Sequence, residues 1–389
     1  MKKYLVGFSW LASVILAHAQ SSVTLYGVVD DGFHFNSNAG GRHLYGMCSG
    51  CMSGSRWGLK GSEDLGGGVK VIFTIEAGMA INSGALGQGG SMFGRQAFIG
   101  VANNLGTLTL GRQYSPGNWY VGWPFVAGAS WAASGAGIGA HPGDVDNLDS
   151  SNRVNNALVY TMPTVGGFTG GVMYSFGNVP GRMTENRVIA IGGAYVNGPM
   201  RLGVGYQVAN RPNFSSFGVN PSASPTGNNA SSPVDIGYAS AGAQKIFAAG
   251  AAYTIGSATI AGSYSNTRFT DLGATAVTGL TTTEAAYRGS ATFNIGELNF
   301  TYQLTPAFSF GVSYSYTRSS GVNDARYQQI DLGVDYFLSK RTDLYGVAVY
   351  QRVAGTDSRG LPAVAAITGA TASSTNNQTV AVVGIRHKF

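Results

Sequence analysis

Charged residues are scarce in this chain. Asp, Glu, Lys and Arg together make up 11% of its 389 residues, whereas ordinary soluble domains contain about 25%. A surface with so little charge is difficult to keep soluble unless much of it contacts something other than water. The scarcity of charge therefore disfavours a soluble protein and makes lipid the natural neighbour.

Long apolar runs are missing beyond the first 20 residues. A transmembrane helix needs about 20 consecutive, predominantly apolar residues, and no later stretch of the sequence supplies them. This absence excludes a helical membrane protein and leaves a secreted soluble fold or a membrane-spanning β-barrel. The composition, with 59 Gly, 20 Tyr and 19 Phe but 12 Pro, favours the barrel once the low charge is considered.

The chain has two cysteines, Cys48 and Cys51, in a C-x-x-C spacing. In an exported protein this spacing is typical of a small loop disulfide or a simple free pair, because a redox role would need a thioredoxin-like βαβ context that is missing. A structural zinc site needs four ligands, and only His43 lies nearby. We therefore expect no metal site and no cofactor.

The first 19 residues have the layout of a secretory signal peptide. Lys2 and Lys3 precede an apolar run at 6–16, and Ala17-His18-Ala19 matches the A-x-A pattern of a cleavage site. An uncleaved anchor helix is the alternative, but the run is far shorter than the about 20 residues that span a bilayer. We expect residues 1–19 to be removed and residues 20–389 to form the mature protein.

The net charge of the mature chain is weakly positive. Without Lys2 and Lys3, 22 of the 24 basic residues remain against 18 acidic ones, which gives +4. A nucleic-acid-binding surface needs clustered Lys and Arg on one face, and here the basic residues are dispersed. Nucleic acid is therefore excluded as a partner.

Apolar and polar residues alternate along much of the chain. Within 308–317, Phe310, Val312 and Tyr314 share one face, and Ser313 and Ser315 share the other. The segments 328–338, 201–208 and 258–265 show the same alternation. A period of two residues indicates β-strands with one apolar and one polar face.

Three further features distinguish a membrane barrel from a soluble β-sandwich, whose strands also alternate. The strand candidates are about 10 residues long, which is enough to cross the hydrocarbon layer at a tilt. Short and long connections alternate along the chain. Aromatic residues stand at the strand ends, as interfacial girdles require. Examples are Tyr160, Tyr174, Tyr195, Tyr206 and Tyr350.

The connections give the number of strands. Short turns lie at 64–68, 103–106, 164–167, 197–199, 255–257, 305–307 and 339–341, and long connections lie near 36–54, 80–90, 114–152, 177–185, 210–242, 268–288, 318–326 and 353–377. Seven turns and eight loops join sixteen strands, and an even count is typical of outer-membrane barrels. We predict an all-β, 16-stranded antiparallel transmembrane β-barrel with short periplasmic turns and long extracellular loops. Its lumen is too wide for side chains to fill and holds water.

Six segments of the sequence carry a family resemblance. They are SVTLYGV (22–28), SRWGLKGSEDLG (55–66), FGRQAF (93–98), LGRQY (110–114), RVNN (153–156) and GIRHKF (384–389). Together they resemble the general porins of β-proteobacteria and Neisseria, from the signal peptide to the last residue.

The resemblance implies a homotrimer of barrels in the outer membrane. Each barrel has its own pore for the passive diffusion of ions and small hydrophilic solutes, narrowed by an inward-folded third loop, which is 114–152 here. The implied partners are outer-membrane lipid and lipopolysaccharide. In that family the terminal Phe, here Phe389, is the address read by the barrel-insertion machinery.

The sequence also indicates which side chains line the constriction. Strand parity turns Arg56, Lys60 and Arg153 toward the lumen, and Glu76 shares the inward face of its strand. Arg95 matches a constriction arginine of the family. Because Arg95 shares parity with apolar residues of its strand, we expect a bulge or local irregularity there.

Acidic residues of the third loop are expected to face these arginines. Asp144 and Asp146 lie near the end of 114–152, and opposed charges across a narrow point create a transverse field that sets ion preference. Arg112 shares parity with Leu108 and Leu110, so we do not assign it to the constriction. The positive charge of the mature chain predicts at most a mild anion preference.

A substrate-specific channel or an adhesin-like binding barrel is the first alternative function. Substrate specificity would add aromatic residues to the lumen, and Trp119, Trp123 and Trp131 of the third loop are the only hint of them. Packing of that loop against the wall is the favoured explanation of these tryptophans.

An enzyme built on a barrel is the second alternative. The mature chain keeps His34, His43, His141 and His387, and none stands in a recognisable Ser/His/acid arrangement. We therefore expect a channel and no enzyme.

Overall fold

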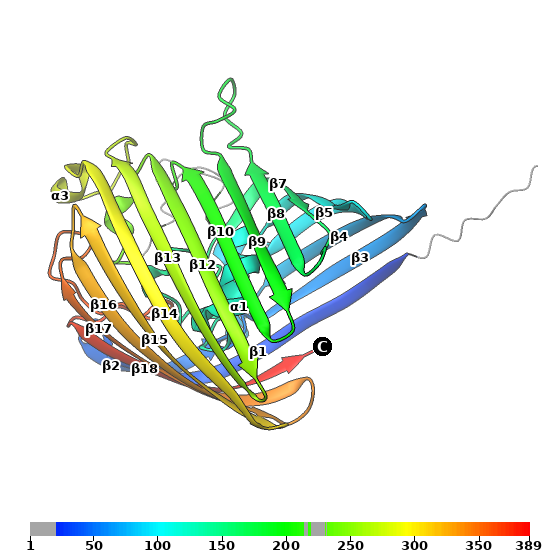
Figure 1. The fold of residues 1–389 in the computed structure, drawn as a ribbon. Helices are drawn as coiled ribbons and strands as arrows, with labels where there is room; N and C mark the ends of the chain where they lie inside the picture. Colours follow the sequence, from blue (N-terminus) through cyan, green and yellow to red (C-terminus); the bar gives the residue numbers. More distant parts are fainter. Residues whose placement is uncertain (1–20, 214–216, 219–229, 231) are drawn as a thin grey trace, which may run out of the picture.

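The computed structural model describes residues 21–213, 217–218, 230 and 232–389. The expected signal peptide, 1–19, lies outside the described residues. The described chain forms one antiparallel sheet that curves into a barrel (Figure 1). No helix in this part of the chain is long and apolar enough to cross a membrane.

The elements follow one another along the chain with strands predominating. The strands are β1 (Ser22–Ala39), β2 (Arg42–Ser49), β3 (Arg56–Gly66), β4 (Val69–Gly78), β5 (Gln96–Asn103), β6 (Gly106–Gln113), β7 (Arg153–Thr161), β8 (Phe168–Ser175), β9 (Val188–Asn197), β10 (Met200–Asn210), β11 (Phe217–Gly218), β12 (Ala243–Ile255), β13 (Ala258–Leu272), β14 (Gly289–Thr305), β15 (Phe308–Gly321), β16 (Ala325–Phe337), β17 (Thr342–Gly355) and β18 (Asn377–Lys388). The short helical segments are η1 (Gln88–Gly90), η2 (Asn118–Gly122), α1 (Trp123–Phe125), α2 (Ala127–Ser130), η3 (Pro142–Asp144), η4 (Ile236–Tyr238) and α3 (Thr282–Ala285).

Sixteen strands make up the wall in the described part of the chain. β2 and β3 both pair with β1, so they form one wall strand that is interrupted at 50–55. β11 is a two-residue strand in a loop that pairs with the first residues of β7. The first and last strands, β1 and β18, also pair, with Val28 opposite Lys388. The sheet is therefore closed, and the predicted count of sixteen is confirmed.

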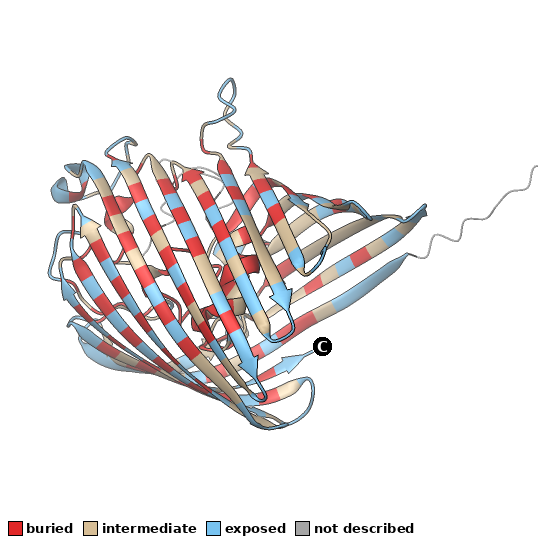
Figure 2. Cartoon of the chain, in the orientation of Figure 1, coloured by how far each residue is buried: buried red, intermediate tan, exposed pale blue. Residues whose placement is uncertain are grey.

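Burial along the strands is inverted relative to a soluble protein. On β15 and β16, Tyr314 is 45% exposed and Leu332 is 53% exposed, whereas Ser313 and Asp331 are at most 2% exposed. Figure 2 shows this alternation of exposed and buried residues along the long strands β13 to β17. An outer surface of large apolar side chains requires an apolar neighbour, and in lipid a closed barrel satisfies every backbone hydrogen bond.

The predicted short turns are confirmed, and two of the predicted long connections are shorter than expected. The connection 36–54 is largely a hairpin of β1 and β2 with its turn at Gly40 and Gly41. The connection 318–326 shrinks to 322–324, because β15 and β16 continue to pair up to Arg318 and Arg326. The prediction placed the ends of these strands where the alternation of apolar and polar residues stops. The strands continue further because backbone hydrogen bonding does not require apolar side chains.

The third long connection, 114–152, folds into the barrel. The Ala127 N–H donates to Glu297 Oε1 on β14 (2.8 Å), and Gln329 Nε2 on β16 donates to the carbonyl of Gly139 (3.2 Å). Since Glu297 and Gln329 are buried on the inner face, these bonds hold the loop across the lumen.

Glycines on the inner wall make room for this loop. A Cβ atom at Gly203 would lie 1.9 Å from the carbonyl oxygen of Tyr120, and one at Gly333 would lie 2.7 Å from the ring of Trp131. Side chains at these positions would push the loop away from the wall. Packing against the wall therefore accounts for Trp131.

Candidate functional site

Three arginines meet beside the third loop. Arg56 begins β3, Arg95 directly precedes β5, and Arg153 begins β7. Arg95 Nε lies 2.7 Å from Glu76 Oε1, and Arg56 Nε lies 3.7 Å from Glu76 Oε2. Arg95 and Arg153 each donate to the hydroxyl of Tyr114 at 3.0 Å. Glu76 and Tyr114 thus fix the directions of the three guanidinium groups.

An opening of about 560 Å³ lies in front of these arginines. One side is formed by the barrel wall and the segment 50–55, and the other is formed by the third loop. Its lining includes Ser53, Arg56, Arg95, Ser134, Asp149 and Arg153. Three positive side chains and one carboxyl group therefore border the same opening.

The carboxyl group at the opening is Asp149. Burial, and then the neighbouring Asp144, raise the pKa of Asp149 well above its usual range, and Arg153 opposes this shift. A raised pKa favours the uncharged carboxyl. Even if Asp149 and Glu76 are both ionised, three arginines exceed two carboxylates, so the opening is electropositive.

The structure places Asp144 and Asp146 away from this opening. Asp144 accepts hydrogen bonds from the backbone N–H groups of Asp149 and Ser151, each at 3.0 Å, so it shapes the end of its own loop. Asp146 Oδ2 lies 2.7 Å from His141 Nδ1 and is buried against β13. The two carboxylates fix the loop and do not face the arginines.

Lys60 lies next to the arginine cluster without joining it. Its Nζ atom stands 5.4 Å from the centre of the Tyr26 ring. The Tyr26 hydroxyl donates to Glu76 Oε2 at 2.9 Å. Lys60 and Glu76 are thus linked through Tyr26, whereas Arg56 and Arg95 contact Glu76 directly.

Local irregularities bring Arg95 and Arg112 to the site. Arg95 stands before the first residue of β5, so the parity of that strand does not apply to it. The pairing of β6 with β7 shifts between Gly111 and Gln113, and Gly111 has a φ of 139°. This bulge turns Arg112 so that its Nε donates to the carbonyl of Gly94 (2.8 Å).

The sequence does not predict the positions of Arg112 and Tyr114 beside the arginine cluster. Parity placed Arg112 with Leu108 and Leu110, and only the glycine before it marks the bulge. Tyr114 follows β6 directly and contacts both Arg95 and Arg153. No pattern in the sequence gives such a contact between residues 39 positions apart.

Comparison with known proteins now identifies the family. The profile of the Gram-negative porins matches residues 9–356. The chain belongs to this family. This porin is 31% identical over 403 residues to outer membrane porin protein 32 of Delftia acidovorans, and the match covers 100% of each chain.

Solved structures share the barrel fold. The anion-selective porin from Comamonas acidovorans is similar to this porin with a TM-score of 0.68 and 26% identity, over 95% of this chain and 100% of that one. The trimer form of OmpT, an outer membrane protein of Vibrio cholerae, shares the fold at a TM-score of 0.62 and 16% identity, over 95% and 99% of the two chains.

Membership and fold together establish the general role. This porin is an integral outer-membrane protein whose barrel forms a water-filled channel for passive diffusion. The relatives that it matches are porins, which are channels and not enzymes. The arginines border the opening between the barrel wall and the third loop.

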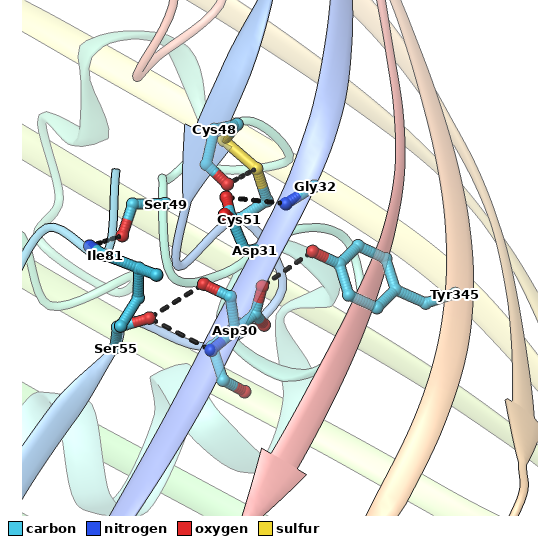
Figure 3. Close-up of a disulfide and its surroundings, with 10 residues drawn as sticks. Asp30, Asp31, Gly32, Cys48, Ser49, Cys51, Ser55, Ile81 and Tyr345 are labelled. Atoms are coloured by element: carbon cyan, nitrogen blue, oxygen red, sulfur yellow. Dashed lines mark hydrogen bonds between the residues drawn. A yellow bond between two sulfur atoms is a disulfide. The ribbon is translucent and has the colours of Figure 1, made fainter. Parts of the chain in front are cut away.

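A disulfide closes the segment that borders the opening. Cys48 and Cys51 are bonded at the end of β2 (Figure 3). The carbonyl groups of Cys51 and Met52 accept hydrogen bonds from the N–H groups of Ala136 and Gly135, both at 3.2 Å. The disulfide therefore constrains the segment 50–55, and the third loop is hydrogen-bonded to that segment at Gly135 and Ala136.

Replacing both cysteines with serine is expected to lower the free energy of unfolding by about 2 kcal/mol. A disulfide stabilises mainly by restricting the unfolded chain, and a loop this short gives an effect near the lower end of the usual range of about 2–4 kcal/mol. Urea unfolding in detergent would measure it. Reduced wild-type protein is the control and should match the C48S/C51S variant; equal stability of the oxidised protein and the variant would contradict the expectation.

Proposed function

We propose that this porin is a general diffusion channel with a mild preference for anions. The observation that carries the proposal is the cluster of Arg56, Arg95 and Arg153 at the opening beside the third loop. Glu76 contacts two of these arginines and Asp149 borders the same opening, so two carboxyl groups face three guanidinium groups and positive charge is in excess. A positive constriction attracts anions and repels cations.

The relationship to a characterised channel supports the same preference. The Comamonas acidovorans protein, described as an anion-selective porin, covers 95% of this chain. A small excess of fixed positive charge at a wide, water-filled opening is screened by salt over about 10 Å at 0.1 M ionic strength. The preference is therefore expected to be mild and to weaken as salt is raised.

Reversal potentials in planar bilayers test this proposal. With a gradient of potassium chloride, the wild-type channel is expected to favour chloride, and the R56Q/R95Q/R153Q variant is expected to lose that preference or reverse it. Arg182→Gln is the control, because Arg182 is exposed on a loop and pairs with Glu185. A cation-preferring wild-type channel whose reversal potential is unchanged in the triple variant would refute the proposal.

We also infer that the chain works as a homotrimer and catalyses no reaction. The trimer form of the Vibrio cholerae relative, which shares the fold, supports the assembly, and the channel function of the matched family supports the lack of catalysis. Cross-linking of the detergent-extracted protein tests the trimer. Hydrolysis assays with ester and peptide substrates test the second inference.

Export and membrane insertion complete the proposal. The proposed signal peptide, 1–19, directs export, and outer-membrane lipid and lipopolysaccharide surround the barrel. Phe389 is the proposed address for the insertion machinery. In the folded barrel its N–H donates to the Gly27 carbonyl (3.1 Å) and its carbonyl accepts from the Gly27 N–H (3.1 Å), so the address is paired with β1 once insertion is complete.

A further inference from the structure

A second cavity of about 490 Å³ lies within the barrel on the short-turn side of the third loop. We refer to it as the apolar hollow. Its wall side comes from the inner faces of β4 to β10, and its other side comes from the first part of the third loop. Its lining includes Ile72, Phe98, Trp119, Tyr120, Val159 and Arg201.

The apolar hollow is unusual for the interior of a wide barrel, which is ordinarily polar. Ile72, Phe98 and Val159 lie on inward-facing positions, because they share faces with Glu76, Gln96 and Thr109 of the same sheet. The pairs Glu76↔Gln96, Thr74↔Phe98 and Thr109↔Val159 show this register. Apolar side chains on a water-facing surface indicate a place where an apolar solute gains by leaving water.

Aromatic residues of the third loop form the opposite side. Trp119 is 50% exposed, and its ring meets that of Trp123 edge to face with centres 4.3 Å apart. Tyr114 borders both the apolar hollow and the arginine-lined opening. An aromatic surface thus continues from the constriction into the hollow, where a flat ring can stack on it.

The charge of the hollow is positive and unpaired. Arg201, the second residue of β10, lines the hollow. Within the described residues its guanidinium group has no hydrogen-bond or ion-pair partner, and no Asp or Glu is among the described residues that line the hollow. An unpaired guanidinium at the edge of an apolar cavity matches a carboxylate on an apolar body.

We propose that the apolar hollow is a binding subsite for single-ring aromatic carboxylates on their way through the channel. The ring rests between Trp119 and the apolar wall, and the carboxylate pairs with Arg201. The volume lies within the range of about 300–1,000 Å³ that small-molecule sites occupy. Binding is weak, because a solute that crosses a channel must also leave it. This proposal rests on the diffusion function and names a solute class that the channel retains.

Blockade of single-channel chloride current by benzoate tests the proposal. Saturating, millimolar blockade of the wild-type channel is expected, with acetate giving none and cyclohexanecarboxylate giving less. Arg201→Gln and Trp119→Leu are each expected to raise the half-blocking benzoate concentration about tenfold, a loss typical of one charged or aromatic contact. Lys70→Gln is the matched control, because Lys70 is an inward-facing cation near the same rim that does not line the hollow.

Four results would overturn the proposal. A channel that conducts chloride but is blocked no more by benzoate than by acetate has no such subsite, and its diffusion function stands. Equal blockade by benzyl alcohol shows that the carboxylate is not recognised. Blockade by benzoate that is unchanged in Arg201→Gln places the site elsewhere. This variant should fold normally, because the Arg201 side chain has no partner in the described structure. A wild-type protein without any conductance would overturn the diffusion function as well.

Discussion

Replacing Leu332 with arginine is expected to lower the free energy of unfolding in a bilayer by about 2–4 kcal/mol, the cost of an arginine on the lipid face near the membrane centre. Leu332 lies in the middle of β16, is 53% exposed, and stands opposite Val312 and Ala348 on the neighbouring strands. A guanidinium group at this position has apolar side chains and lipid as its surroundings. Urea unfolding of the refolded barrel in phospholipid vesicles would measure the loss.

The same substitution four residues earlier provides the control. Gln328 lies on the same outer face of β16 but nearer the rim of the long loops. Arginine at an interfacial depth costs about 0–1 kcal/mol, because its side chain reaches water and headgroups. Equal losses for Leu332→Arg and Gln328→Arg, or no loss for either, would show that this face of the barrel is not in contact with hydrocarbon.

The fold could be predicted because one simple pattern determines it. In β15 and β16 each residue alternates between lipid and lumen, so Tyr314 and Ser313 reveal their surroundings through their chemical types alone. Strand ends were less predictable, since β15 continues to Gly321 after its apolar residues end. Backbone hydrogen bonds, which carry no sequence signal of their own, set those boundaries.

The arginine cluster could be predicted from the sequence only where its residues lie on regular strands. Parity gave the inward direction of Arg56 and Arg153, which begin β3 and β7. It could not give the direction of Arg112, because one bulged residue exchanges the two faces of a strand. A bulge depends on how two strands pair, and here Gly111 is the only mark of it in the sequence around Arg112.

The directions of the acidic side chains in the third loop could not be predicted from the sequence. Asp144, Asp146 and Asp149 lie within six residues of one another, yet only Asp149 borders the opening. The loop has no periodicity from which directions can be read. Its path is set by partners far away in the sequence, such as Glu297 on β14, which no local pattern indicates.

His141 joins the third loop to the barrel wall through a buried ionic network. Its Nδ1 atom lies 2.7 Å from Asp146 Oδ2 and its Nε2 atom lies 3.0 Å from Glu297 Oε2. Ser265 on β13 also donates to Asp146. The other charged groups that influence the network are Asp331 on β16 and Asp144 and Asp149 of the loop. We call this network the loop latch.

The loop latch has a defined dependence on pH. Although burial opposes it, the carboxylates of Asp146 and Glu297 raise the pKa of His141 well above 6.5. Stability from protonated His141 is therefore complete below about 6.5 and is lost as the pH rises through the higher pKa of the folded state. His141 lowers the pKa of Asp146 against the effect of burial, so that contribution is lost only as the pH falls below about 3.8.

Asp144 weakens the loop in a separate, acidic pH range. Burial and then the charge of Asp146 raise the pKa of Asp144 to about 6. A carboxyl group that binds its proton more tightly when folded makes the protein less stable as the pH rises from about 3.8 to its folded pKa. Asp144 therefore loosens the third loop between pH about 3.8 and about 6, whereas His141 loosens it at higher pH.

Replacing His141 with alanine is expected to lower the free energy of unfolding by about 3–5 kcal/mol at pH 6, because removing one partner leaves buried, unpaired carboxylates behind. The free energy of unfolding of the variant should also fall less than that of the wild type as the pH rises, because the contribution of His141 is absent. Single channels of the variant should close and reopen more often as the third loop detaches. Unfolding titrations between pH 5 and 10, with bilayer recordings at the same pH values, measure both effects. His43→Ala is the matched control, since His43 is exposed on β2. If His141→Ala kept both the wild-type stability and the wild-type pH profile, the third loop would be held by its backbone contacts and apolar packing alone, and the ionic network would have no part in keeping the channel open.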